Sequence, residues 1–143
     1  MSFTAAEVEY IRSQPLLRVA TVAPDGQPDV VPVGFAFDGT HFWIGGYDPT
    51  HTRRTRNLQG GNDKVALVID DLAPGGGWKP RYLRVYGTGE LVERPAGSGT
   101  LNLKVTPTVS WSMNLDAGWS PGASGGPAVQ RTEHHPPEER VRG

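Results

Sequence analysis

Three arginines lie within four positions of the sequence, Arg53, Arg54 and Arg56, in the segment YDPTHTRRTRNLQGG at residues 47–61. The chain has 14 basic and 15 acidic residues and a formal net charge of −1, so a generally basic composition does not explain the cluster. Clustered like charges repel one another, and a nearby anion offsets that repulsion. The cluster can be interpreted as a phosphate-binding site. The alternative is that the three arginines lie on an exposed, solvated helix face.

The same segment predicts a short helix that begins at Arg53 with Thr52 as its N-cap. At about 100° per residue, Arg53, Arg56 and Asn57 share one face of this helix, and Arg54 lies at the edge of that face. Helix N-terminal amides and planar guanidinium groups both favour phosphate oxygens. We therefore take these five residues as candidate phosphate ligands, although their spacing fits the solvated-face alternative equally well.

Other catalytic chemistries find little support in the sequence. Cysteine is absent, which excludes disulfides, thiolate metal sites and a cysteine nucleophile. The four histidines, at positions 41, 51, 134 and 135, show no spacing with acidic residues that would form a zinc site. A GxSxG match at residues 122–126 lies outside any strand-turn-helix pattern, so it does not predict a nucleophile elbow.

Length and composition predict one folded domain and a tail. The chain has 143 residues, enough for one core, but only 36% are hydrophobic, and it contains 19 glycines and 13 prolines. We expect a folded domain over residues 1–116 and a Gly/Pro/Ser-rich, disordered tail over residues 117–143, because the tail has few large apolar side chains. The N-terminus lacks a signal-peptide pattern, and no run reaches the roughly 20 apolar residues that cross a bilayer. A cytoplasmic protein without membrane or nucleic-acid partners is the expectation.

Local patterns predict the elements that position the arginines. Thr4 and Glu7 form a capping box for a short helix that ends near Ser13, before Pro15. Short β-rich runs separated by Asp-Gly turns follow and indicate an antiparallel meander. The six predicted strands are LLRVATVA (16–23), DVVPVGFAF (29–37), HFWIGG (41–46), KVALVID (64–70, a central strand), RYLRVYGTGELVE (81–93, with a bulge or bend at its glycines) and TVSWSM (108–113, the last strand).

This order of elements resembles that of the pyridoxamine 5′-phosphate oxidase-like split-barrel flavoproteins. The motifs that carry the resemblance are VPVGF, the Gly-Gly strand end, the Thr-Arg-Arg-x-Arg-Asn-Leu segment and KVALVIDD. The chain is most similar to the F420-dependent oxidoreductase group of these flavoproteins, from about Phe3 to Met113. The resemblance implies a mainly β, six-stranded split β-barrel with short flanking helices, which forms a homodimer with flavin or deazaflavin sites between the subunits. The stretch RPAGSGTLNLK (94–104) is sparser than in relatives, which usually carry a fuller helix or strand there.

The resemblance also implies cofactor contacts outside the arginine cluster. Pro32, Val33 and Gly34 correspond to the strand that runs along the isoalloxazine-type ring, and Gly45 and Gly46 to the strand end above the phosphate. Glycine at the strand end allows the backbone to approach the cofactor closely. A merely flexible strand exit is the alternative for Gly45 and Gly46.

Trp78 and Lys79 lie in the glycine-rich loop PGGGWKPR, which in this family would cover the cofactor from the partner subunit; an exposed loop is the alternative. The predicted function is hydride transfer between F420 and a small unsaturated or conjugated substrate, with no catalytic side chain identified because the cofactor supplies the reactive carbon. F420 is favoured because an extended cationic trail, continued by Lys79 and Arg81, suits its phosphate and polyglutamate tail. An FMN-dependent oxidoreductase and a non-catalytic flavin- or haem-binding protein are the alternatives.

Overall fold

The helix α1 (Ala5–Ser13) opens the fold in the computed structural model, which describes residues 2–135. Thr4 Oγ1 accepts a hydrogen bond from the Glu7 amide at 3.1 Å, and Glu7 Oε1 accepts one from the Thr4 amide at 2.9 Å. The predicted capping box and the predicted end at Ser13 are confirmed. Tyr10 and Ile11 on the inner side of α1 belong to the hydrophobic core, so the helix is fixed against the sheet by its apolar side chains.

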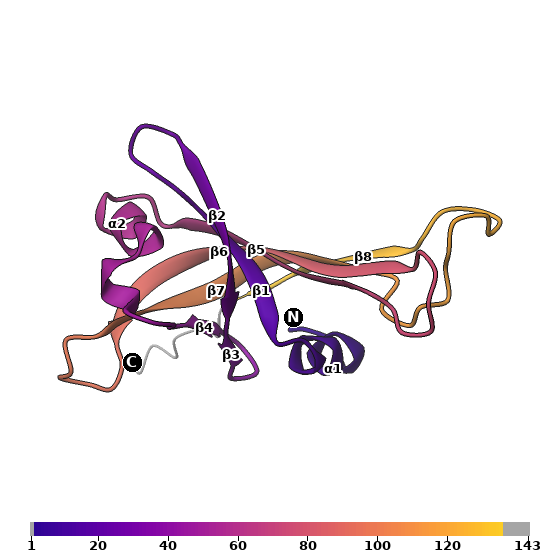
Figure 1. The fold of residues 1–143 in the computed structure, drawn as a ribbon, viewed down its shortest axis with the longest axis horizontal. Helices are drawn as coiled ribbons and strands as arrows, with labels where there is room; N and C mark the ends of the chain where they lie inside the picture. Colours follow the sequence, from indigo (N-terminus) through magenta and orange to yellow (C-terminus); the bar gives the residue numbers. More distant parts are fainter. Residues whose placement is uncertain (1, 136–143) are drawn as a thin grey trace, which may run out of the picture.

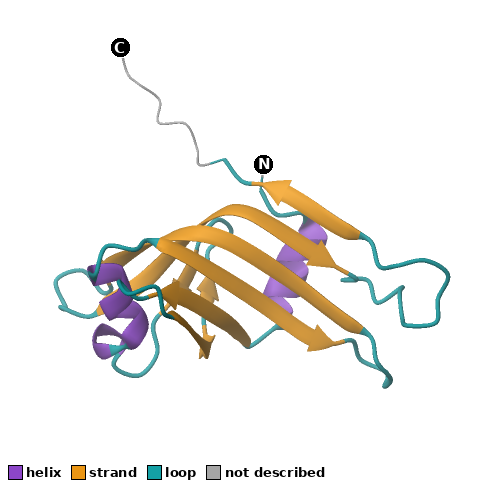
Figure 2. Cartoon of the chain, turned by 90° about the horizontal axis from the view of Figure 1, so that it is seen from above, coloured by secondary structure: helices purple, strands orange, loops and turns teal. Residues whose placement is uncertain are grey.

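The rest of the described chain forms one curled antiparallel sheet with α1 against it and α2 near one end (Figures 1 and 2). Its strand order is β2-β1-β5-β6-β7-β4-β3, and β8 pairs with β7. The mainly β split-barrel architecture is confirmed. The strands are β1 (Leu16–Val22), β2 (Pro28–Gly34), β3 (Ala36–Phe37), β4 (Phe42–Ile44), β5 (Lys64–Leu72), β6 (Pro80–Glu93), β7 (Leu101–Met113) and β8 (Val129–Glu133).

Eight strands replace the six that the sequence predicts. The run DVVPVGFAF divides at Phe35, so that β2 pairs with β1 while β3 pairs with β4 at the other end of the strand order. This break lets one run of residues serve both edges of the half-barrel. The last predicted strand is also longer than expected, because β7 already begins at Leu101 and pairs with β6, β4 and β8 along its length.

The strand β8 lies in the segment for which the sequence predicts a disordered tail, and for residues 129–133 that prediction is wrong. Five residues of β8 pair with Val109–Met113 of β7, and Thr132 is buried. Just beyond the strand, His134 Nε2 lies 2.7 Å from Ser110 Oγ, and its ring lies 4.4 Å from that of Phe3. Backbone pairing and these contacts replace the large apolar side chains that the segment lacks. Residues 136–143 of the predicted tail lie outside the described residues.

The central strands supply most of the core. On β5, as the sequence predicts for a central strand, Val65, Leu67 and Ile69 alternate inward between β1 and β6. The register of β6 against β7 shifts between Tyr86 and Gly87, which confirms the predicted bulge. A Cβ on Gly87 would lie 2.5 Å from a backbone oxygen of β7, so only glycine allows the strands to approach this closely. No helix within residues 2–135 is both long and apolar enough to cross a bilayer.

Candidate functional site

The arginine segment forms the helix α2 (Arg53–Gln59), which follows the 3-10 turn η1 (Pro49–His51). Thr52 is its N-cap, as predicted, and its Oγ1 accepts a hydrogen bond from the Thr55 amide at 3.3 Å. Arg54 turns inward and is only 8% exposed. Its Nη2 donates to the Gly45 carbonyl at 2.7 Å, which ties α2 to the end of β4.

The predicted orientation of α2 is confirmed for Arg53 and Arg56, which are exposed, and is wrong for Asn57. Asn57, expected beside Arg53 and Arg56 on a cationic face, is buried and donates through Nδ2 to Thr21 Oγ1 at 2.9 Å. Arg53 and Arg56 are exposed, whereas Arg54 lies on the buried side. A helix of two turns has its inner face set by the elements it contacts, and here a buried hydroxyl on β1 requires the Asn57 amide as a partner.

Arg54 is a buried cation that has no carboxylate partner among residues 2–135. Within residues 2–135, no Asp or Glu oxygen lies within 4.0 Å of its guanidinium. Burial lowers the pKa of Arg54, and the more distant charge of Asp29 opposes that shift. Arginine nevertheless remains charged in proteins, and a buried charge is costly unless it is paired. An anion beside Arg54 would supply that pairing.

Gly45, whose carbonyl Arg54 contacts, lines a cavity of about 300 Å³, and Arg54 itself is not among the lining residues. Three of the predicted site residues, Gly34, Gly45 and Gly46, line this cavity, and none of its lining residues is acidic. The Arg94 guanidinium at its edge stacks over the Trp43 ring at 4.0 Å from the ring centre. The full lining is Gly34, Phe35, Ala36, Trp43, Gly45, Gly46, Arg94 and Asn102.

The two adjacent glycines keep the backbone of this strand end accessible. A Cβ on Gly45 would lie 2.6 Å from Asn102 Oδ1. Gly46 has a φ of +104°, and a Cβ there would lie 3.5 Å from Arg54 Nη2. A side chain at position 45 would displace Asn102, and at position 46 the positive φ itself disfavours a side chain, because a contact of 3.5 Å is an ordinary one. Glycine at both positions leaves main-chain groups to meet any ligand.

The other predicted site residues do not meet this cavity within one chain. Pro32 is exposed on β2, and the Val33 side chain packs against the core. Trp78, 63% exposed, and Lys79 belong to the loop between β5 and β6, at the opposite end of β5 from α2 (Figure 1). A role for them at the same site requires a second copy of the chain, as the sequence interpretation assumed.

Arg81, the far end of the predicted cationic trail, is engaged elsewhere. Its Nε and Nη2 donate to Asp71 Oδ1 and Oδ2 at 2.7 and 3.0 Å, and its guanidinium lies over the ring of Tyr10. The Tyr10 hydroxyl donates to the same carboxylate at 2.8 Å. This cluster fixes α1 to the hairpin of β5 and β6, so Arg81 does not continue the predicted cationic trail within one chain.

Sequence reasoning missed Trp43, Arg94 and Asn102. No local motif marks them, because they come from three separate places along the chain. Antiparallel pairing of β4 with β7 sets Trp43 opposite Lys104, and the hairpin between β6 and β7 brings Arg94 to the same edge. Asn102 Nδ2 donates to the Arg94 carbonyl at 3.3 Å, which connects these two lining residues.

Residues 3–104 match the family described as pyridoxamine 5′-phosphate oxidase, and the chain belongs to this family. The chain is 39% identical, over 81% of its own length and 87% of the relative, to a protein of Streptomyces rimosus named 5a,11a-dehydrotetracycline/5a,11a-dehydrooxytetracycline reductase. A solved structure titled F420 reductase shares 27% identity with a TM-score of 0.51, covering 68% of this chain and 90% of that one.

Proteins of lower sequence identity share this fold. A conserved protein of Mycobacterium tuberculosis has a TM-score of 0.65 at 19% identity, with 87% of this chain and 93% of that chain covered. At that identity the likeness concerns the fold alone. Together with the family match and the reductase relative, it identifies the chain as an oxidoreductase of the pyridoxamine 5′-phosphate oxidase family with a split-barrel fold, as the resemblance in the sequence implied.

Proposed function

We propose that this chain is an F420-dependent oxidoreductase whose cofactor phosphate binds beside Arg54, Gly45 and Gly46. The observation that carries the proposal is the guanidinium of Arg54, which is 8% exposed and lacks a carboxylate within the described chain. A phosphate there would accept charge-assisted hydrogen bonds and neutralise the buried charge. An FMN-dependent oxidoreductase of the same fold is the alternative.

The charges around the cavity favour a cofactor with more than one anionic group. Arg94 borders the cavity from the β6–β7 side, and the exposed Arg53 and Arg56 extend the positive region along α2. F420 carries both a phosphate and a polyglutamate tail, whereas FMN carries a single phosphate. The preference for F420 rests on this distribution of cations and on the likeness to the F420 reductase structure.

The bound deazaflavin would supply the hydride, and the protein would supply binding and orientation. Phe35 and Trp43 give the cavity aromatic surface against which a ring can lie. Gly34, Gly45 and Gly46 offer backbone amides and carbonyls at the ring edge without side chains in the way. In this proposal the chain therefore holds the reactive ring in place, and specificity for the acceptor comes from the surfaces around it.

The acceptor we propose is a conjugated dehydro compound. The Streptomyces rimosus relative is named as a reductase of 5a,11a-dehydrotetracyclines, and it matches this chain over most of both lengths. Addition of a hydride and a proton to a conjugated carbon–carbon double bond is the reaction that such a name describes. We extend that reaction type, and a fused-ring acceptor as its first candidate, to this chain.

A homodimer completes the proposed site. Large apolar side chains remain exposed on the face of the sheet that is turned away from the core: Leu16 is 46%, Val30 65%, Leu72 50% and Tyr86 46% exposed. A second copy of the chain against this face would cover them, and its Trp78 loop would be available to cover the cofactor. A cytoplasmic location, expected from the sequence, is part of the same proposal.

Visible-region titration of the purified protein with F420, FMN and haem tests the proposal. We expect saturable binding of F420 and, with reduced F420, consumption of 5a,11a-dehydrotetracycline measured by absorbance. Binding and turnover with FMN alone would favour the alternative cofactor. Binding of haem alone, or cofactor binding without turnover of any conjugated acceptor, would contradict the proposal and favour a non-catalytic carrier.

A further inference from the structure

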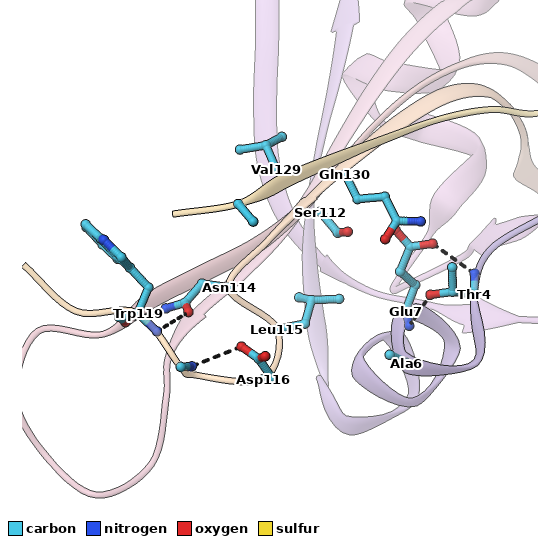
Figure 3. A pocket seen from close by; sticks show the side chains of 12 residues that line it. Thr4, Ala6, Glu7, Ser112, Asn114, Leu115, Asp116, Trp119, Val129 and Gln130 are labelled. Atoms are coloured by element: carbon cyan, nitrogen blue, oxygen red, sulfur yellow. Dashed lines mark hydrogen bonds between the residues drawn. The ribbon is translucent and has the colours of Figure 1, made fainter. Parts of the chain in front are cut away.

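A second and larger cavity, of about 520 Å³, lies between α1, the end of β7, the loop after it and β8 (Figure 3). It shares no lining residue with the cavity beside Gly45. Nothing in the proposed cofactor site uses it. Its walls come partly from the segment after residue 116, for which the sequence predicted no structure.

One carboxylate oxygen at this cavity has no partner. Glu7 is 1% exposed, and its Oε1 is occupied by the Thr4 amide in the capping box. Its Oε2 is buried and has no hydrogen-bond partner within the described residues. The carboxylate is directed towards the side chains of Ser112 and Gln130 (Figure 3). An unpaired buried carboxylate oxygen is costly, so a hydrogen-bond donor at this position would be stabilising.

Among the described residues, no cationic side chain forms an ion pair with Glu7. The residues lining the cavity include no Lys, Arg or His, and Asp116 adds a second carboxylate at the exposed rim. The basic side chain of His134 lies nearby, but it is hydrogen-bonded to Ser110 rather than to Glu7. Burial lowers the pKa of His134, against the opposing influence of Glu7. The cavity therefore favours a positive charge.

The opposite wall is apolar and held in place. Leu115, Trp119 and Val129 contribute apolar surface. Trp119 Nε1 donates to the Gly125 carbonyl at 3.0 Å. Asn114 Nδ2 donates to the Trp119 carbonyl at 2.8 Å, and Asn114 Oδ1 accepts a hydrogen bond from the Trp119 amide at 2.9 Å. An aromatic ring fixed in this way presents a constant surface to a ligand.

We propose that this cavity is a binding site for a small organic cation, an ammonium group carried on an apolar body. The ammonium donates to Glu7 Oε2 and finds further acceptors in Ser112 and Gln130, while the apolar body lies against Leu115 and Trp119. A metal ion fits less well, because no group of three His, Cys, Asp or Glu side chains in residues 2–135 could hold one. The site is independent of the cofactor proposal.

Phenethylammonium is a suitable probe, and phenethyl alcohol is its neutral counterpart of similar shape. Binding is followed at neutral pH by the nuclear magnetic resonance shift of the Trp119 indole N–H, assigned with a Trp119→Phe variant. We expect the ammonium to bind more tightly than the alcohol. Glu7→Gln should remove that preference and weaken ammonium binding roughly 10- to 150-fold, as for loss of a charge-assisted hydrogen bond.

Glu7→Gln is a sharp test because glutamine at this helix position retains the capping box, so α1 should remain intact. Glu9→Gln is the matched control, since it removes the same charge from an exposed position of α1 that does not line this cavity. Ala128→Trp fills the cavity from its rim, leaves Glu7 in place and should abolish binding of both probes. Equal affinity for the two probes, an equal effect of the two glutamine variants, or unchanged binding in Ala128→Trp would overturn the proposal.

Discussion

Replacement of Asp71 by alanine should cost the fold about 3 kcal/mol. The Asp71 carboxylate accepts four hydrogen bonds, two from Arg81, one from the Tyr10 hydroxyl and one from Gln14. The Arg81 and Asp71 side chains are only 16% and 24% exposed. The variant therefore leaves a mostly buried guanidinium without a carboxylate, with the Leu115 carbonyl at 3.3 Å as its remaining partner, and leaves the Tyr10 hydroxyl with only the Arg81 carbonyl at 3.4 Å. Charge-assisted bonds contribute about 1.5–3 kcal/mol each without adding fully, which gives a loss of about 2–4 kcal/mol.

Asp70→Ala is the matched control on the same strand. Its carboxylate pairs with Arg18 at 2.8 Å, but the two side chains are 44% and 42% exposed, and pairs of this kind contribute about 0–1 kcal/mol. Urea denaturation of both variants and the wild type at pH 7 measures the difference in unfolding free energy. A loss in Asp71→Ala that does not exceed the loss in Asp70→Ala would refute the reasoning.

The pH dependence gives an independent check. Hydrogen bonds from Arg81, with those from Tyr10 and Gln14, hold the pKa of Asp71 below its ordinary value, although burial acts in the opposite direction. Because the pKa of Asp71 is lower in the folded than in the unfolded state, its contribution to folding stability is complete above the unfolded-state pKa of about 4. That contribution is lost as the pH falls through the folded-state pKa. The stability gap between wild type and Asp71→Ala should therefore narrow below about pH 4. A gap that widens there would contradict this account.

Three further predictions concern separate parts of the fold. Truncation after Asp116 removes β8 and should lower the melting temperature by more than a few degrees in a thermal scan, whereas an unchanged value would show that the pairing with β7 adds no stability. Asn57→Ala should cost about 1–3 kcal/mol in urea denaturation, because it leaves the buried Thr21 hydroxyl without its partner; a loss below about 0.5 kcal/mol would contradict that role. Light scattering at micromolar concentration should give the mass of a dimer, and Tyr86→Glu on the exposed sheet face should shift it towards the monomer; a monomeric wild type would rule out the shared site.

The elements set by local chemistry could be predicted from the sequence. The capping box of Thr4 and Glu7, the N-cap at Thr52 and the bulge at Gly87 each depend on residues that are close in sequence or on the properties of one glycine. The central position of β5 also followed from its compact apolar run. The two caps act within a few residues, and the glycine at position 87 and the apolar run of β5 are visible in the sequence itself, so the pattern was sufficient in these cases.

Features that depend on distant partners could not be predicted in this way. Arg54 was expected at the edge of an exposed face, but the contacts of α2 with the sheet turn it inward towards Gly45. The strand β8 lacks large apolar residues, and its stability comes from the free edge of β7, which composition does not reveal. Arg94 and Asn102 reach the cavity through strand pairing. The sequence thus singled out the segment, whereas the burial and contacts of its individual residues required the structure.

The central claim, that Arg54 binds the cofactor phosphate, is tested most directly by calorimetric titration of Arg54→Ala with F420 and FMN. Arg12→Ala is the matched control, because it removes an exposed arginine of α1 that does not line the cavity beside Gly45, and circular dichroism checks that both variants are folded. We predict roughly 10- to 150-fold weaker binding in Arg54→Ala, a much smaller effect in Arg12→Ala, and weaker binding of the wild type at high salt. Unchanged affinity in a folded Arg54→Ala variant, with intact binding by the wild type, would contradict the account.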